Sequence, residues 1–303
     1  MSAETVRSLG VTTIGGREFR WGERTFVMGI VNATPDSFSG DGLLASEPSA
    51  VVAALALASR MVAEGADLLD VGGESTRPGH DPVDGPEEAR RVVPIMAGLR
   101  SAHPDVPISI DTTKPVVAGA ALDAGASLIN DVWGVSDDDS LARLAADRAV
   151  PIVLMHNRAE PRYRDLVVEV IDDLRRAIDR ALAAGCPWEG LIVDPGFGFG
   201  KTPEHNLTLL RELGALRVLG RPILLGTSRK STLGRVLDLP VDQRLEATLA
   251  TTALGIAAGA DIVRVHDVQA NVRAARMTDA IVRGGPPEPS VPPGPAVRSE
   301  SPR

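Results

Sequence analysis

Short apolar runs alternate with Ala-rich helical patterns along most of the chain. Eight runs rich in Val, Ile and Leu predict β-strands at residues 26–31, 67–71, 107–110, 127–130, 151–155, 191–193, 222–225 and 261–265. Helical patterns follow most of these runs, as at residues 50–64, 87–100, 163–184 and 244–258. Eight such units in about 250 residues favour a closed (β/α)8 TIM barrel, although a doubly wound open sheet has the same local pattern.

Three parts of the chain differ in this pattern. Residues 1–25 form an N-terminal extension, in which Gly15, Gly16 and Gly22 favour a small β-hairpin ahead of the first barrel strand. Residues 26–283 carry the alternating pattern of the α/β barrel. Residues 284–303 (GGPPEPSVPPGPAVRSESPR) are too rich in Pro and Gly to bury a core, so a disordered tail is predicted there.

Composition and charge narrow the class of protein. Only 3% of the 303 residues are aromatic while 44% are hydrophobic, so aliphatic side chains must fill the interior, as in parallel sheets covered by helices. The net charge of −8 disfavours nucleic acid and anionic membranes as partners. A single cysteine, Cys186, excludes an internal disulfide and fits a reducing compartment. Because the first 21 residues contain no apolar block, we expect neither signal peptide nor membrane anchor, and a cytoplasmic location.

One apolar run near the end of the pattern, ADIVRVHD (260–267), carries Arg264 and His266 two residues apart. Because strand side chains alternate between faces, both groups are expected to point the same way. At the carboxyl end of a buried strand, such a pair would bind a multiply charged anion such as a phosphate. An exposed edge strand with an ordinary Arg and His fits the same residues.

Polar residues also occur at or just after the carboxyl ends of other predicted strands. They are Asn32, Asp111, Asn130 and Asp194. In a barrel these strand ends converge on one mouth, so the polar residues would meet Arg264 and His266 there. Each Asn or Asp could instead be a turn former or a helix cap.

Eight motifs in the chain resemble those of a known family. They are MGIVNATPDSFS (28–39), DVGGESTRPG (70–79), SIDTTKP (109–115), LINDVWG (128–134), VLMHNR (153–158), DPGFGFGKT (194–202), GTSRKS (226–231) and RVHDV (264–268). Through these motifs, in the family's order, residues 28 to 270 resemble the dihydropteroate synthases. The resemblance implies a pterin-binding barrel that joins 4-aminobenzoate to 6-hydroxymethyl-7,8-dihydropterin diphosphate, giving 7,8-dihydropteroate and diphosphate.

The resemblance implies a pocket for the pterin diphosphate. Its residues would be Thr76, Asp111, Asn130, Met155, Asp194, Phe199, Lys230, Arg264 and His266. Asp194 would accept hydrogen bonds from the adjacent amide and amino groups of the pterin. Met155 and Phe199 would contact the ring, although both could simply fill the barrel. Lys230 would reach both substrates; its alternative is a solvated lysine at a helix start, where the helix dipole disfavours a cation.

An aminobenzoate pocket and a metal site follow from the same resemblance. The pocket would be shaped by Phe38, Thr76, Arg77, Pro78 and Ser231. Their Gly- and Pro-rich loops could otherwise be merely long turns. Asn32 would hold Mg²⁺, an ion that typically keeps few protein ligands while it bridges phosphates.

The catalytic residues implied by the resemblance are Lys230, Arg264 and His266. No Ser, His and acid motif for a nucleophile is evident, and displacement of diphosphate by an arylamine needs none. We expect diphosphate to depart first, its charge stabilised by Mg²⁺, Arg264 and His266, before the largely unprotonated amine attacks. Loops 33–45 and 72–86 are expected to close over the site and exclude water.

Two positions depart from the family pattern. Gly40-Asp41-Gly42 replaces the usual Asp-Gly-Gly, and Thr232 stands where an aromatic residue is expected. Two other functions fit a pterin-binding barrel: methyl transfer from methyltetrahydrofolate to a corrinoid, and noncatalytic pterin binding. Arg264 and His266, together with the SRKS motif, favour the synthase over both. The resemblance also implies a homodimer packed through barrel helices.

Overall fold

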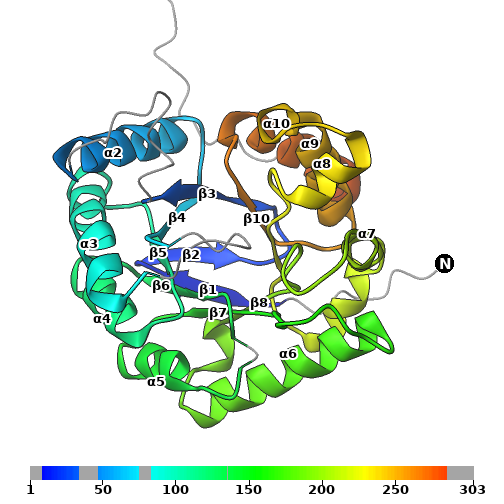
Figure 1. The fold of residues 1–303 in the computed structure, drawn as a ribbon, viewed down its shortest axis with the longest axis horizontal. Coiled ribbons are helices and arrows are strands. Elements are labelled where there is room, and N and C mark those ends of the chain that lie inside the picture. The colour runs from blue at the N-terminus through cyan, green and yellow to red at the C-terminus, as the bar shows by residue number, and fades with distance from the viewer. Residues whose placement is uncertain (1–8, 34–46, 75–82, 135, 285–303) are drawn as a thin grey trace, which may run out of the picture.

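A ring of parallel strands forms the centre of the molecule (Figure 1). The computed structural model describes residues 9–33, 47–74, 83–134 and 136–284. The barrel strands in this part are β3 (Phe26–Asn32), β4 (Leu68–Gly72), β5 (Ile108–Asp111), β6 (Leu128–Asp131), β7 (Ile152–Met155), β8 (Leu191–Asp194), β9 (Leu224–Leu225) and β10 (Ile262–Val265). Their order is β8-β7-β6-β5-β4-β3-β10-β9, and a parallel bridge from Val193 to Ile223 joins the two ends. The closed TIM barrel is therefore confirmed over the open sheet.

Helices surround the ring on its outer side (Figure 1). They are α2 (Glu47–Ala63), α3 (Gly85–Ala102), α4 (Pro115–Asp123), α5 (Ser140–Asp147), α6 (Leu166–Ala183), α7 (Pro203–Arg211), α8 (Ser231–Leu237), α9 (Leu245–Ala257) and α10 (Val268–Asp279), with short 3₁₀ segments η1 (Trp188–Gly190), η2 (Leu213–Leu219) and η3 (Val241–Gln243) and a π-helical end, η4 (Ala280–Gly284). The main aliphatic core lies between these helices and the strands. None of the helices in the described residues is long and apolar enough to cross a membrane.

The expected helix bounds differ most at the starts of α2 and α6, each by three residues. The pattern predicts a helix from residue 163, but α6 begins at Leu166. Asp165 caps it, because its carboxylate accepts a hydrogen bond from the Val168 N–H. The residues before the cap are therefore available to form part of the loop that follows β7.

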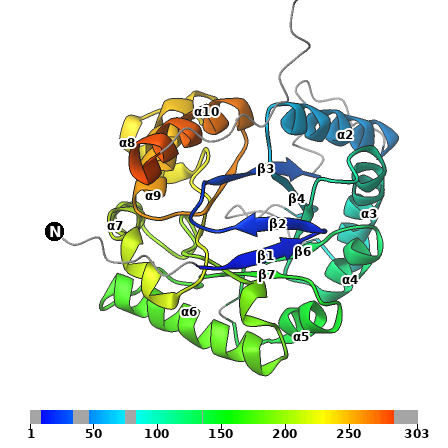
Figure 2. The ribbon, with the colours of Figure 1, turned by 180° about the vertical axis from the view of Figure 1, so that it is seen from behind.

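The predicted N-terminal hairpin is confirmed as β1 (Val11–Ile14) paired antiparallel with β2 (Arg17–Arg20). Gly15 and Gly16 form its two-residue turn with φ of 59° and 85°, values that favour glycine. Figure 2 shows the hairpin lying across one end of the ring. Phe19 and Trp21 pack there on inward side chains of the barrel strands, such as Met28, so the hairpin closes this end.

A buried carboxylate fixes the hairpin to the amino-terminal ends of the strands. Asp67 precedes β4 and accepts hydrogen bonds from Arg17 and Arg24, at 2.8 and 2.5 Å. Its other oxygen accepts from the Val27 N–H at 2.9 Å. One side chain therefore joins the hairpin, β3 and β4. The predicted tail lies outside the described residues from residue 285 onward.

We expect Asp67→Ala to lower the free energy of unfolding by roughly 2 kcal/mol, because it leaves the buried N–H of Val27 unpaired and removes the carboxylate that Arg17 and Arg24 share. Denaturant unfolding followed by circular dichroism measures this change. Glu18→Ala is the control, since the Glu18 side chain is 58% exposed and pairs only at the surface with Arg20. Equal stability of the two variants would contradict the anchoring role of Asp67.

Candidate active site

The carboxyl ends of neighbouring strands bring polar side chains together at the other end of the barrel. Asp111 ends β5 and is paired in register with Gly72 of β4 and with Asn130 of β6. Asp194 ends β8 and is paired with Met155, the last residue of β7. These pairings follow from parallel strands of similar length, so the predicted convergence of Asp111, Asn130 and Asp194 is confirmed.

Arg264 of β10 is held between two buried carboxylates. Its Nε donates to Asp70 Oδ2 at 2.6 Å, and its Nη2 donates to Asp111 Oδ2 at 2.6 Å. Asn130 Nδ2 also donates to Asp70 Oδ2, at 3.1 Å. Asp70 is 0% exposed. The ring closure between β3 and β10 is what allows a residue near the end of the chain to meet residues of β4 and β5.

Several acceptors in this group are buried and have no hydrogen-bond partner within the described part of the chain. They are Asp70 Oδ1, Asp111 Oδ1 and Asn130 Oδ1. A buried acceptor without a donor is costly, so such atoms indicate where a ligand's N–H groups could bind. A flat heterocycle with several N–H donors fits this set of acceptors.

Burial shifts the ionisation of the groups in the mouth. It raises the pKa of Asp111 to about 7 against the opposing charge of Arg264, while Asp70 and Glu88 add to the rise. Burial also raises the pKa of Asp194, although Lys230 opposes the change. Burial lowers the pKa of Lys230 to about 7 despite the attraction of Asp194. The pKa values of Asp111 and Lys230 therefore both lie near neutral pH, as is common for groups of an active site.

Lys230 lies directly before α8, where its side chain turns toward the segment that follows β8. Lys230 Nζ donates to the Phe197 carbonyl and lies 4.0 Å from the centroid of the Phe199 ring. Asp194 and Arg264 both act electrostatically on Lys230, so the three groups share one end of the barrel. The alternative of a solvated lysine at a helix start is therefore wrong for this side chain.

His266 lies just after β10 and contacts the loop after β9. Its ring Nδ1 is 2.9 Å from Ser228 Oγ, and its backbone N–H donates to the same oxygen at 3.2 Å. Ser228 was not singled out from the sequence. Arg229, the next residue, forms two hydrogen bonds with Asp267, at 3.0 and 2.6 Å, which tie the same two loops together.

The remaining predicted residues lie partly at this mouth and partly outside the described residues. Asn32 ends β3 at this mouth, Met155 is buried, and Ser231 is exposed as the first residue of α8. Thr232, the departure from the family pattern, is buried and accepts a hydrogen bond from Asn206 Nδ2 at 2.9 Å. Phe38, Asp41, Thr76, Arg77 and Pro78 lie outside the described residues.

Sequence reasoning missed Asp70, the acceptor for both Arg264 and Asn130. A signal was present, because Asp70 is a carboxylate on the inward side of an otherwise apolar strand and needs a partner. It also missed Glu74, whose Oε1 accepts from the Val83 N–H at 2.9 Å and whose Oε2 accepts from Lys114 at 2.5 Å. Glu74 therefore joins the two residues that flank segment 75–82 to the β5–α4 connection.

Known proteins are similar to this chain in sequence and in fold over most of their length. A family described as pterin binding enzyme matches residues 28–266. The dihydropteroate synthase of Clostridium beijerinckii is 51% identical over 271 residues, covering 89% of this chain and 99% of that protein. A dihydropteroate synthase structure from Xanthomonas albilineans with 4-aminobenzoic acid has a TM-score of 0.84 at 43% identity, covering 89% of this chain and 97% of that one. The structure of the same enzyme in complex with 7,8-dihydropteroate has a TM-score of 0.81 at 42% identity, covering 89% of this chain and 98% of that one.

The chain therefore belongs to the pterin-binding enzyme family, and within that family to the dihydropteroate synthases of folate biosynthesis. The resemblance inferred from the motifs is confirmed. The barrel mouth described above is the part of the fold in which enzymes of this architecture carry their active sites.

Two of the chain's lysines are expected to affect stability with opposite signs. The folded pKa of Lys230, about 7, lies below its ordinary 10.5, so the unfolded chain binds more protons between these values and stability rises with pH there. Lys230→Met removes this cost. We therefore expect the variant to be more stable than the parent in denaturant unfolding, most at about pH 6 and least at about pH 10.

Lys114→Met is the matched control. Burial alone would lower the pKa of Lys114, but its hydrogen bonds to Glu74 and Glu88 raise it. The stabilisation by Lys114 is therefore complete below its ordinary pKa and is lost only as the pH rises through the higher folded value. Its loss should cost roughly 2–4 kcal/mol at neutral pH, because Glu88 is left buried without its cation. Destabilisation of both variants at about pH 6 would contradict the assigned charge balance.

Proposed function

We propose that this barrel mouth joins 4-aminobenzoate to 6-hydroxymethyl-7,8-dihydropterin diphosphate, and that Arg264 is central to the reaction. The observation that carries the proposal is the group of Arg264, Asp70, Asp111 and Asn130, which has a cation and unpartnered buried acceptors in one place. The substrate matches it, since it has a donor-rich ring and a strongly anionic tail. The relatives with bound 4-aminobenzoic acid and 7,8-dihydropteroate support the same reaction.

The pterin ring is assigned to the acidic side of the mouth. Asp194 Oδ1 accepts from the Gly196 N–H at 2.7 Å and is held in place by it. Both carboxylate oxygens of Asp194 keep lone pairs that can accept from the amide and amino groups of the ring. Asp111 and Asn130 supply further acceptors, and Met155 and Phe199 supply apolar contact.

The diphosphate is assigned to Arg264 and His266. The charge of Arg264 and a ring N–H of His266 stabilise the leaving group as the bond between the pterin methylene carbon and the diphosphate oxygen breaks, with both electrons passing to diphosphate. The nitrogen lone pair of 4-aminobenzoate then forms the new C–N bond, and the nitrogen releases a proton to solvent. Lys230, beside Phe199 and Asp194, orients the two rings. Ser231 borders the aminobenzoate side, for which Phe38, Thr76, Arg77 and Pro78 stay predictions.

Asn32 is assigned to Mg²⁺. Within the described residues, no three His, Cys, Asp or Glu side chains form a metal site, so a fully protein-bound ion does not fit this part of the mouth. A single hard amide oxygen at the end of β3 does fit an ion whose other ligands are diphosphate oxygens and water. When bound, Mg²⁺ supplies charge neutralisation to the departing diphosphate.

We further propose a homodimer that works in the cytoplasm. Leu254 of α9, Met277 of α10 and Ile281 of η4 are large apolar side chains with exposures of 61%, 63% and 70%. Helices α9 and α10 pack against each other, and η4 continues α10, so these exposed residues lie on neighbouring elements. Exposed apolar side chains on neighbouring elements favour packing of barrel helices between two copies. Cys186, the single cysteine of the sequence, is buried and forms no disulfide, which suits a reducing compartment.

Release of diphosphate from the pterin substrate tests the reaction. We expect release to depend on both 4-aminobenzoate and Mg²⁺, and Arg264→Ala to lower kcat/KM by about 10²–10³-fold, because a charge that stabilises the leaving group is lost. Arg143→Ala is the control, since Arg143 is 68% exposed on α5, and it should keep parental turnover. No release by the parent protein would favour a methyltransferase or a noncatalytic binder, and near-normal turnover of Arg264→Ala would remove Arg264 from the mechanism.

A further inference from the structure

The turn that follows β8 is packed tightly between two other segments. Gly196, Gly198 and Gly200 have φ of 69°, 85° and 53°. A Cβ on Gly196 would lie 1.7 Å from the His156 carbonyl oxygen, and one on Gly200 would lie 2.2 Å from the Arg158 carbonyl oxygen. On Gly198 it would lie 2.6 Å from Lys230 Cδ. The bare backbone of turn 196–200 therefore separates the segment after β7 from the stem of Lys230.

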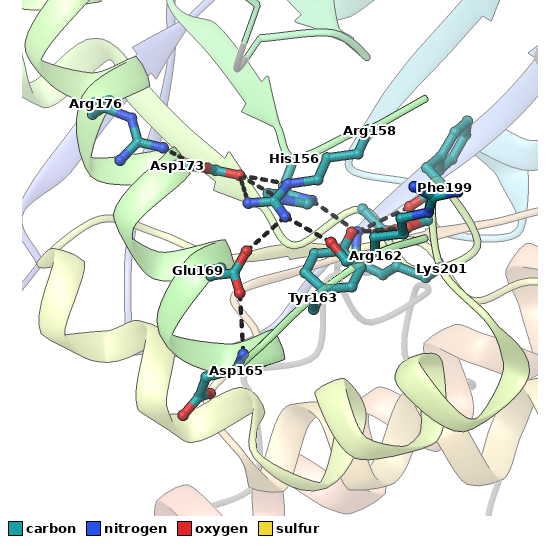
Figure 3. A network of polar contacts seen from close by, with 12 residues as sticks. His156, Arg158, Arg162, Tyr163, Asp165, Glu169, Asp173, Arg176, Phe199 and Lys201 are labelled. Carbon is teal, nitrogen blue, oxygen red and sulfur yellow. Dashed lines mark hydrogen bonds and ion pairs between the residues drawn. The ribbon is translucent and has the colours of Figure 1, made fainter. Parts of the chain in front are cut away.

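Lys201 ties this turn to the segment after β7. Its Nζ is 2.8 Å from His156 Nδ1 and donates to the carbonyl oxygens of Gly196 and Phe199, both at 3.0 Å (Figure 3). Burial lowers the pKa of Lys201 to about 7 although Asp194 opposes the change, and in its ammonium form the side chain has three donors, which these three acceptors use. The start and the middle of the turn are thus held by one side chain.

The His156 ring is held on its other side by Asp173. Burial lowers its pKa to about 3, and the charge of Lys201 adds to the effect, so the ring is neutral at physiological pH. A neutral ring that accepts from Lys201 at Nδ1 must carry its proton on Nε2, which is 3.1 Å from Asp173 Oδ2. Arg158 donates to the same oxygen from Nε at 3.0 Å and from Nη2 at 2.7 Å (Figure 3). These contacts extend from the turn to α6.

The far end of the turn has its own support from the same region. Tyr163 Oη donates to the Gly200 carbonyl at 2.8 Å, and the Arg158 guanidinium lies 4.6 Å from the centroid of the Tyr163 ring. Tyr163 belongs to the loop between β7 and the start of α6. One cluster, formed by His156, Arg158, Tyr163, Asp173 and Lys201, therefore holds the turn at both ends.

Turn 196–200 contacts two residues to which the proposed function assigns the substrates, Lys230 and Asp194. The Phe197 carbonyl accepts from Lys230 Nζ, and the Phe199 ring lies under the same ammonium. The Gly196 N–H donates to Asp194. A displacement of the turn would therefore change the positions of Lys230 and Asp194 together.

We propose that Lys201 is a positioning residue for the reaction: it clamps turn 196–200 onto His156 and thereby holds Lys230 and Asp194 in their productive places. This inference rests on the proposed function for its kinetic consequence. A purely structural role would instead affect the stability of the fold and leave the surroundings of Lys230 in the folded protein unchanged.

The lysine content of the chain makes a direct test possible. The sequence has only three lysines, Lys114, Lys201 and Lys230. Protein labelled with ¹³C at the lysine ε-carbon therefore gives three methylene signals, which single Lys→Met variants assign. The Phe199 ring should shift the ε-protons of Lys230 upfield. In Lys201→Met we expect the Lys230 signal to move toward the value of an unstructured lysine, while the signal of Lys114, bound to Glu74 and Glu88, stays in place.

Turnover of the same variant provides the second readout. We expect kcat of diphosphate release to fall by about 10- to 100-fold, with a smaller change in the KM for the pterin substrate, because the chemical step depends more on orientation than binding does. An unshifted Lys230 signal together with kcat within about twofold of the parent would overturn the proposal. If the parent releases no diphosphate, the proposed function fails, while the NMR comparison still tests the clamp.

Lys201→Gln covers the case in which Lys201→Met does not fold. Its amide keeps two donors but is shorter, so its Lys230 signal and its kcat should lie between those of the parent and those of the Met variant. If only the Gln variant folds, a displaced Lys230 signal supports the clamp and an unchanged signal overturns it.

Discussion

The partly buried guanidinium of Arg264 between Asp70 and Asp111 is the interaction on which the site depends. Charges taken out of water are costly unless partners are held in good geometry. Here the geometry comes from the closed ring, since β10 pairs with β3 and β3 pairs with β4, so residues almost two hundred positions apart meet within hydrogen-bond distance. The barrel is thus the condition for the charge cluster, and the cluster leaves acceptors over for a ligand.

Around this cluster lies a second layer of polar contacts that holds the loops. Lys201 and His156 fix the turn after β8, and Lys114 with Glu74 and Glu88 fixes the residues that flank segment 75–82. Each of the chain's three lysines therefore has a defined place at this end of the barrel: Lys230 lies beside Phe199, and Lys114 and Lys201 hold loops. Burial disfavours the charge of Lys230, so under the proposed function stability and activity would oppose each other at this residue.

Much of the fold was predictable from the sequence because alternating strand and helix patterns are local signals. The hairpin, the ring and the bounds of the four expected helices, to within three residues, follow from them, whereas the start of α6 depends on the Asp165 cap. Polar residues at strand ends gave Asp111, Asn130 and Asp194. Periodicity shows that a strand residue points inward but not which partner it meets across the ring, so Asp70 was missed. The contacts of Lys201 were missed because its acceptors are two backbone carbonyls and a histidine from another loop.

The central claim is that one mouth binds the pterin ring and the diphosphate tail together. Calorimetric titration of the parent protein with pterin diphosphate, with and without Mg²⁺, tests it most directly when compared with 6-hydroxymethylpterin and inorganic diphosphate titrated separately. We expect pterin diphosphate to bind more tightly than either fragment, and Mg²⁺ to strengthen the binding of only the two ligands that contain diphosphate. Prior saturation of the protein with either fragment should weaken the binding of pterin diphosphate. Independent binding of pterin diphosphate and hydroxymethylpterin, with no effect of Mg²⁺, would contradict it.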